Sequence, residues 1–332
     1  MKPHAYGEDT QARKSILSVA FVVGVFPATS ETFIINQVAD LIDRGVDVRI
    51  FSLSKGSEDT VSDRYTTYRM KERVVYLTPP KNIGLRLCMG AGIALRMLFT
   101  HPRILFRALN MRKYGAVSKS LKLLFWVFPF LDTKFDLIHC HMGTVATKYL
   151  TMRSVLGQTT KFVTTFYGYD VSRTPQQKGI DCYRDLALAC DLFFVMSENM
   201  KSRVLPLGVP QEKIVVHPIS IDVESYEFNE RTLAPDETVQ ITSVGRFVEK
   251  KGFDDLLRAI AVVKKGAKRP FRLSIVGDGE LHDEIHSLAK ELDVTDVVDF
   301  KGYMKLEDVL SLYGRSHLYV QASKTAKDGD ME

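Results

Sequence analysis

A strand-to-helix corner in the last third of the chain carries two cations at a spacing suited to phosphate chemistry. In VGRFVEKKGFDDLL, Arg246 follows a buried apolar run, Lys251 comes five residues later, and Gly252 opens an amphipathic segment. Ligands of open parallel sheets bind at the carboxyl ends of strands, beside helix N-termini. Two fixed cations next to a positive helix end suit a diphosphate. The alternative is a corner that simply carries solvated basic residues, as loops often do.

The strand ends that follow carry glycines and aromatic residues. IVGDGEL places Gly277 and Gly279 after an apolar run, where a missing side chain lets backbone approach a ligand closely. VDFKGYM places Phe300, Gly302 and Tyr303 at the end of the next run. Because the carboxyl ends of parallel strands share one edge of a sheet, we expect these residues to line the same cleft as the cationic corner.

Polar residues also follow the first apolar run of the chain. FPATSE places Ser30, Glu31 and Thr32 at the entry of a predicted helix. Their backbone N–H groups could therefore face the phosphates or hydroxyls of a ligand. Ser30 also suits a plain N-cap, and the sequence favours this as its sole role.

Two histidines stand two residues apart in IHCHMG. Side chains alternate along a strand, so His139 and His141 are predicted to share one face near its carboxyl end. A zinc site needs more ligands than this run supplies, so we predict no zinc there. We expect His141, nearer the cleft, to contact a ligand bound there. His139 is expected to be a hydrogen-bonded core residue.

The stretch TTFYGYDVS adds a phenol and a carboxylate at the end of a further predicted strand. Tyr167 can donate a hydrogen bond, but a phenol is a poor base near pH 7. Asp170 could hydrogen-bond a sugar or could cap the following turn, and the sequence leaves both roles open.

Apolar runs of strand length alternate with helical patterns, which predicts parallel sheets wound with helices. The first group of runs covers residues 15–26, 46–53, 73–77, 135–142, 161–168, 190–197 and about 212–220. The second group covers residues 239–247, 271–279, 297–303 and 317–323. The predicted fold class is α/β, with two Rossmann-like, doubly wound parallel-sheet domains facing each other across a cleft.

The domain boundaries follow from these groups. We assign a mobile tail to residues 1–14, the first domain to 15–220, a turn-rich linker to 221–240 and the second domain to 241–332. A length of 332 residues fits two domains. The second domain has only four predicted strands, so we expect it to be incomplete.

Composition places the chain among ordinary globular proteins. Apolar residues make up 45% and charged residues 26%. The four cysteines form no C-x-x-C pair, which favours free thiols in a reducing compartment. The polar N-terminus lacks an apolar signal core, so we expect a cytoplasmic protein. No uninterrupted apolar run approaches 18 residues, so no membrane-spanning helix is expected.

The net charge of +5 conceals a strongly basic insert at residues 73–131. This stretch contains no Asp or Glu, and the rest of the chain sums to −5. Its ten cations are Arg73, Lys81, Arg86, Arg96, Arg103, Arg107, Arg112, Lys113, Lys119 and Lys122. Interleaved aliphatic and aromatic residues favour an anionic membrane surface over nucleic acid as the partner. The alternative is that these helices fill the core and turn a solvated basic face outward.

The ordered set of motifs resembles a known family. G-R-x4-K-G, V-G-D-G, F-x-G-Y and a strand running into D-G-D-M-E resemble the retaining GT-B glycosyltransferases of the family 4 or group 1 type. FPATSETFIINQV and HCHMGTVA are similar to the colanic-acid and exopolysaccharide branch. The resemblance covers nearly the whole chain from about Ser15.

The resemblance implies roles for individual residues. Arg246 and Lys251 would hold the pyrophosphate of a nucleotide sugar and stabilise the departing nucleoside diphosphate. The backbone at 300–303 would seat the base, and Glu332 would face the donor sugar. His141 would contact the acceptor or donor sugar, and the backbone N–H groups of Ser30, Glu31 and Thr32 would face donor phosphates or acceptor hydroxyls. Tyr167 stands where many relatives carry a histidine. No metal or other cofactor is expected, because side-chain cations and helix dipoles do that work.

Two similar motifs point elsewhere and are set aside. The run DGD at 328–330 imitates the D-x-D metal motif of the other glycosyltransferase fold, but its place after the diphosphate corners fits the GT-B loop. No G-x-G-x-x-G opens a helix, so a nicotinamide dehydrogenase lacks its phosphate turn.

The sequence therefore predicts a glycosyltransferase that moves a sugar with retention from a nucleotide sugar to a lipid-linked glycan in bacterial surface polysaccharide assembly. It would act at the inner face of the cytoplasmic membrane. The alternatives are a nucleotide-sugar epimerase of the same fold and an inactive nucleotide-sugar-binding fragment. The family pattern continues beyond Glu332, so we expect a truncated chain with little transferase activity.

Overall fold

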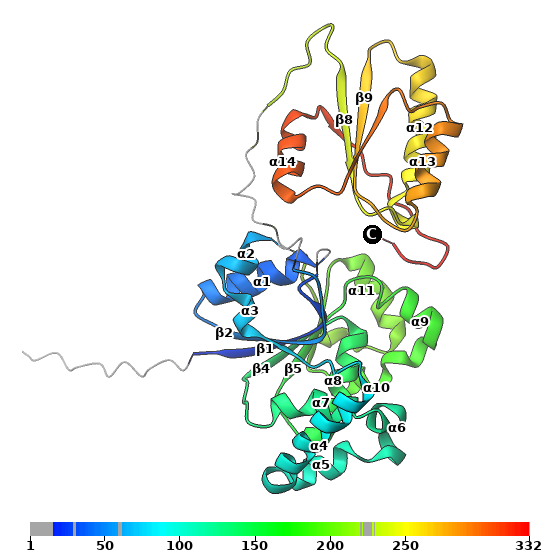
Figure 1. The fold of residues 1–332 in the computed structure, drawn as a ribbon. Helices are drawn as coiled ribbons and strands as arrows, with labels where there is room; N and C mark the ends of the chain where they lie inside the picture. The colour runs from blue at the N-terminus through cyan, green and yellow to red at the C-terminus, as the bar shows by residue number, and fades with distance from the viewer. Residues whose placement is uncertain are drawn as a thin grey trace, which may run out of the picture.

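The computed structural model describes residues 16–28, 31–58, 62–219, 221, 228 and 230–331. Within these ranges the chain forms two separate parallel sheets, and helices lie against both (Figure 1). The seven-stranded sheet of the described part has the order β3-β2-β1-β4-β5-β6-β7, and the four-stranded sheet has the order β10-β9-β8-β11. Both orders are those of doubly wound folds, with crossovers between neighbouring strands.

The first sheet is built from short parallel strands whose centre is β1. Its strands are β1 Ser18–Phe26, β2 Asp47–Lys55, β3 Val74–Tyr76, β4 Leu137–His141, β5 Phe162–Thr165, β6 Leu192–Val195 and β7 Ile214–Val216. β1 pairs with β2 on one side and β4 on the other. Alternate β1 residues face two different cores, with Phe21 and Val23 toward α1 and Ala20 and Val22 toward α8. This burial on both faces explains the continuous apolar run.

The described part of the first domain contains eleven α-helices. They are α1 Thr32–Asp43, α2 Asp63–Thr67, α3 Met70–Arg73, α4 Ile83–Thr100, α5 Pro102–Ala108, α6 Met111–Lys119, α7 Lys122–Val127, α8 Gly143–Leu156, α9 Arg173–Lys178, α10 Arg184–Ala189 and α11 Glu198–Val204. At the end of α1, Gly45 adopts φ +79° and Val46 N–H donates to Leu41 O at 3.0 Å. That glycine-dependent cap ends the helix at Asp43.

The basic insert forms α4 to α7, and its helices differ sharply in burial. α7 is the core element, with Leu123, Leu124 and Val127 buried against α8. α4 packs on α5 and α7 but leaves most of its surface uncovered. α4 is also the one helix in the described ranges that is long and apolar enough to cross a membrane, with 18 residues and a mean hydropathy of 1.4. Arg86 and Arg96 interrupt its apolar sequence, and that no helix of this chain spans a membrane stays a prediction.

The second sheet is smaller and is flanked by three described helices. Its strands are β8 Val239–Val244, β9 Phe271–Val276, β10 Val298–Gly302 and β11 Leu318–Tyr319, and its helices are α12 Phe253–Gly266, α13 His282–Glu291 and α14 Leu306–Arg315. The apolar stripe of α12 is buried as predicted, with Leu257 at the centre of the core. β11 is shorter than the predicted run at 317–323, and it pairs only with β8 at the edge of the sheet. Its two residues stay exposed because nothing in the described chain covers that edge.

Candidate functional site

A cavity of about 490 Å³ lies between the two sheets, at the carboxyl ends of strands from both. Its lining residues are Glu31, Phe33, Met142, Tyr167, Tyr169, Asp170, Arg173, Arg246, Val248, Glu249, Lys250, Glu280, Ala326, Asp328 and Asp330. These residues come from loops that the sequence keeps far apart. The predicted cleft is therefore present, and several of the predicted residues line it.

The cationic corner after β8 supplies the second-domain wall. Arg246 is exposed to the cavity and has no ion-pair partner within the described ranges. Residues 249–251 form a short 3-10 turn, and Gly252 then takes φ +66° to begin α12. A Cβ atom at Gly252 would lie 1.9 Å from the carbonyl oxygen of Ala322, so only glycine fits there.

The 3-10 turn sends its two lysines in different directions. Lys250, which the sequence did not single out, lines the cavity, and its Nζ lies 3.2 Å from Oδ2 of Asp330. Lys251 does not line the cavity. Its side chain lies beside Gly245, and a Cβ atom at Gly245 would be 3.3 Å from Cδ of Lys251. The structure thus brings Arg246 together with Lys250. The role predicted for Lys251 in donor binding stays a prediction.

The glycines after β9 allow two loops to pack on one another. Gly277 has φ +136°, and a Cβ there would lie 1.9 Å from the carbonyl oxygen of Gly245. A Cβ at Gly279 would lie 2.7 Å from the backbone nitrogen of Phe247, whose N–H donates to Asp278 O at 2.9 Å. The backbone that these glycines approach is therefore the cationic loop itself. They fix the position of Arg246, and direct contact with a ligand remains a prediction.

The residues after β10 lie outside the lining of the cavity. Gly277 N–H donates to Gly302 O at 2.8 Å, which links the loop after β9 to the end of β10. Phe300 stacks on His286 with 4.0 Å between ring centroids. Tyr303 is exposed. Residues 300–303 thus lie outside the cavity lining, at the same edge of the sheet, and their role as a seat for a base stays a prediction.

The entrance of α1 forms part of the first-domain wall. Glu31 occupies the N-cap position, Thr32 is the first helical residue, and Ser30 lies outside the described residues. Of these, Glu31 lines the cavity, and partial burial raises the pKa of its carboxyl. Phe33 reaches across to Tyr167, with 4.5 Å between ring centroids.

The two histidines of β4 share one face, as predicted, and both are buried. His139 Nε2 lies 2.7 Å from Oγ1 of Thr165, which is the expected core hydrogen bond. His141 is 1% exposed, and its Nδ1 lies 2.8 Å from the hydroxyl of Tyr167. Burial holds the pKa of His141 well below its usual range, so the ring is neutral. Tyr167 lines the cavity and His141 does not, so any contact of His141 with a sugar would pass through this phenol.

Asp170 is buried, and backbone donors occupy both of its oxygens. Oδ1 accepts N–H bonds from Tyr167 and Gly168, each at 3.0 Å, and Oδ2 accepts one from Gly143 at 2.8 Å. Burial raises the pKa of this carboxyl, and the three hydrogen bonds oppose that shift. Since Gly143 begins α8, Asp170 joins the loop after β5 to the loop after β4. The geometry favours the capping role that the sequence left open.

The segment 324–331 crosses from the second domain to the first. Arg173 Nε lies 3.4 Å from Oδ2 of Asp328, and the Ser172 hydroxyl donates to Asp330 Oδ1 at 3.4 Å. Asp330 also pairs with Lys250, so one carboxylate bridges both domains. In the part of the chain that the structure describes, no group of three or more His, Cys, Asp or Glu residues is placed to hold a metal. Glu332, the predicted catalytic partner, lies outside the described residues.

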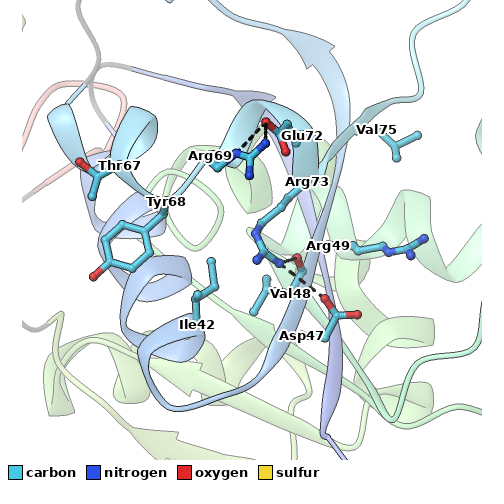
Figure 2. A pocket seen from close by; sticks show the side chains of 10 residues that line it. All are labelled: Ile42, Asp47, Val48, Arg49, Thr67, Tyr68, Arg69, Glu72, Arg73 and Val75. Atoms are coloured by element: carbon cyan, nitrogen blue, oxygen red, sulfur yellow. Dashed lines mark hydrogen bonds and ion pairs between the residues drawn. The ribbon is translucent and has the colours of Figure 1, made fainter.

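A second cavity, of about 660 Å³, lies at the opposite end of the first sheet (Figure 2). Asp47 begins β2 there, and Arg73 immediately precedes β3. Arg73 pairs with Asp47 at 3.5 Å, and Arg69 pairs with Glu72 at 2.7 Å (Figure 2). These are the amino ends of the strands, whereas open α/β sheets bind ligands at the carboxyl ends. The interdomain cavity is therefore the candidate site.

Comparison with known proteins gives two family matches that together span most of the chain. A model described as Glycosyltransferase Family 4 matches residues 30–225, and one described as Glycosyl transferases group 1 matches residues 225–329. The putative colanic acid biosynthesis glycosyltransferase WcaL of Escherichia coli (strain K12) is 29% identical over 95% of this chain and 78% of its own length. The amylovoran biosynthesis glycosyltransferase AmsK of Erwinia amylovora is 28% identical over the same shares.

Solved structures confirm the predicted fold class. Anabaena HepE, in complex with UDP and glucose, matches with a TM-score of 0.64 at 14% identity, over 94% of this chain and 76% of HepE. TarM matches with a TM-score of 0.60 at 11% identity, over 93% of this chain and 81% of TarM. The arrangement of two parallel-sheet domains around a cleft is the GT-B fold.

Proposed function

This chain belongs to Glycosyltransferase Family 4, and from that premise we propose that it moves a sugar, with retention, from a nucleotide sugar to a lipid-linked glycan. The setting would be exopolysaccharide assembly at the cytoplasmic face of the membrane. Support for the setting comes from the relatives named for colanic acid and amylovoran biosynthesis. Support for the donor comes from HepE, whose structures hold UDP, UDP and glucose, or UDP-glucose.

The observation that carries the proposal is the position of Arg246. Its guanidinium is exposed in the interdomain cavity, after a buried strand and beside the start of α12. A departing nucleoside diphosphate gains negative charge in the transition state, and a fixed cation stabilises that charge most where water is excluded. The glycine contacts after β9 support the backbone of the loop that carries Arg246.

The first-domain wall is suited to the acceptor. The carboxylate of Glu31 would repel a phosphate, whereas it can accept a hydrogen bond from a sugar hydroxyl. Tyr167 can donate to or accept from the same sugar. Burial raises the pKa of Tyr167 and lowers that of His141, so neither is tuned to act as a general base near pH 7. This agrees with retention in which the departing phosphate itself takes the acceptor proton.

The test is acceptor-dependent release of nucleoside diphosphate, followed by assignment of the product's anomeric configuration by NMR. The proposal expects release only with acceptor, an unchanged anomeric configuration and no loss of activity in EDTA. Release of nucleotide without acceptor would favour the epimerase. Nucleotide-sugar binding without turnover would favour a binding role. An inverted product would contradict retention.

A further inference from the structure

Helix α4 presents an apolar face that nothing in the described chain covers. Within α4 only Gly90 and Met97 are buried, and the helix packs on α7 and α5 along that seam. The approach at Gly90 is close, since a Cβ there would lie 2.9 Å from Cδ1 of Leu121. The helix is therefore held to the domain along one narrow side only.

The opposite side of α4 consists of large apolar residues. At 3.6 residues per turn, Leu95 and Phe99 point away from the buried seam, and they are 59% and 80% exposed. Leu87, beside them, is 58% exposed. On α5, which packs on α4, Phe106 is 67% exposed. Soluble surfaces rarely carry such a contiguous apolar area without a partner.

Exposed cations lie on the two helices that follow α4. Arg103, Arg107 and Arg112 are exposed on α5 and α6, and none has an ion-pair partner within the described ranges. Arg103 and Arg107 are four residues apart in α5, so they flank Phe106 on one helix face. The insert contains no carboxylate to neutralise them. The surface thus combines apolar side chains with unneutralised positive charge.

We propose that this α4–α5 face docks on an anionic lipid bilayer, with α4 lying in the plane of the interface. Apolar side chains would enter the acyl boundary while the arginines contact lipid phosphates. A second copy of the chain fits less well, because a twofold contact would bring two like-charged surfaces together. Nucleic acid would use the cations but would leave the leucines and phenylalanines exposed.

The docking surface is separate from the sugar-transfer site. α4 and α5 lie at the end of the first domain that is farthest from the second domain (Figure 1). Membrane docking would therefore leave the interdomain cavity open to its ligands. The inference goes beyond the transfer chemistry, and the two can fail independently. An Arg246→Ala variant should lose donor binding and keep membrane binding.

The experiment is co-sedimentation with phosphatidylethanolamine vesicles that contain or lack phosphatidylglycerol, between 0.05 and 0.5 M salt. Binding is expected only with the anionic lipid and should fall as salt rises, because screening shortens the reach of the attraction. Leu95→Ser with Phe99→Ser should weaken binding at least about tenfold, since both side chains would otherwise leave water. Arg103→Gln and Arg112→Gln should each weaken it about fivefold.

Matched controls lie on α12 of the second domain. Val262 is 72% exposed and Lys265 is exposed, so Val262→Ser and Lys265→Gln should bind as the unmodified chain does. All these side chains are exposed, and thermal melting should show that every variant folds. Equal binding to neutral vesicles, no binding at all, or unchanged binding by the Leu95 and Phe99 variant would overturn the proposal. So would a dimer in vesicle-free solution that the same variant dissociates, because the face would then belong to a second copy.

Discussion

Substitution of Asp170 can distinguish two roles for this side chain, which are capping the loop and binding a sugar. Three backbone N–H groups donate to its carboxylate at 2.8 to 3.0 Å, and the side chain is 1% exposed at the wall of the cavity. Asp170→Ala would leave all three donors buried without an acceptor, at about 1–3 kcal/mol each. We therefore expect a loss of at least about 3 kcal/mol in the free energy of unfolding of the first domain.

Asp170→Asn is the graded variant. Its amide oxygen can still accept the two bonds that Oδ1 now receives, while its NH₂ group would face the N–H of Gly143. One hydrogen bond is lost and the Gly143 N–H is left without an acceptor. We therefore expect the free energy of unfolding of the first domain to fall by about 1–3 kcal/mol. The matched control is Asp181→Ala, an exposed aspartate with no side-chain hydrogen bond within the described residues, which should change stability by no more than about 0.5 kcal/mol.

Urea unfolding followed by tryptophan fluorescence suits this test. Trp126 is the only tryptophan in the sequence and lies in α7, so the signal reports on the first domain. The order of stability should be unmodified chain, then Asp170→Asn, then Asp170→Ala. An Asp170→Ala variant as stable as the control, yet with a raised KM for acceptor, would refute the capping role and restore the sugar contact.

Three further perturbations test other parts of the fold and site. Gly277→Ala should destabilise the second domain by about 2 kcal/mol or more in thermal melting, because Gly277 has a positive φ and lies against the backbone of Gly245. The control is Gly266→Ala, which should leave stability unchanged because a Cβ there would meet no other atom within 4 Å. Burial lowers the pKa of His139 to about 3 from an ordinary 6.5, so the unfolded chain binds the proton more tightly. The free energy of unfolding should therefore be highest above pH 6.5 and fall by up to about 1.4 kcal/mol per pH unit as the pH drops toward 3. His139→Gln should reduce that slope, and an identical slope in the variant would contradict the lowered pKa of His139. Asp330→Asn should tighten binding of a nucleoside diphosphate about fivefold by releasing Lys250, and weaker binding in calorimetry would contradict the competition.

The elements that the sequence predicted well are those whose signals are local. The presence of each strand and the amphipathic helix that follows Gly252 depend on a few neighbouring residues, although several predicted runs are longer than the strands. The shared face of His139 and His141 follows from strand alternation alone. The same local rules predicted that the glycines after β8, after β9 and at the end of β10 lie at one edge of the second sheet.

What the sequence missed depends on contacts between distant segments. A 3-10 turn decides that Lys250 rather than Lys251 lines the cavity, and no residue pattern distinguishes the two lysines beforehand. Asp328 and Asp330 pair with cations of both domains, and only the tertiary arrangement brings Arg173 within reach. The burial of His141 behind Tyr167 likewise depends on how neighbouring loops close over a strand end.

The most direct test of the central claim is calorimetric binding of UDP and of GDP to this chain and to two arginine variants. The account predicts that at least one nucleoside diphosphate binds and that Arg246→Ala weakens this binding about tenfold to 150-fold, the equivalent of one charge-assisted hydrogen bond. Arg272→Ala, an exposed arginine on β9 that does not line the cavity, should bind as the unmodified chain does. Equal affinity in the Arg246→Ala variant, or no binding of any nucleoside diphosphate to the unmodified chain, would contradict the donor site described here.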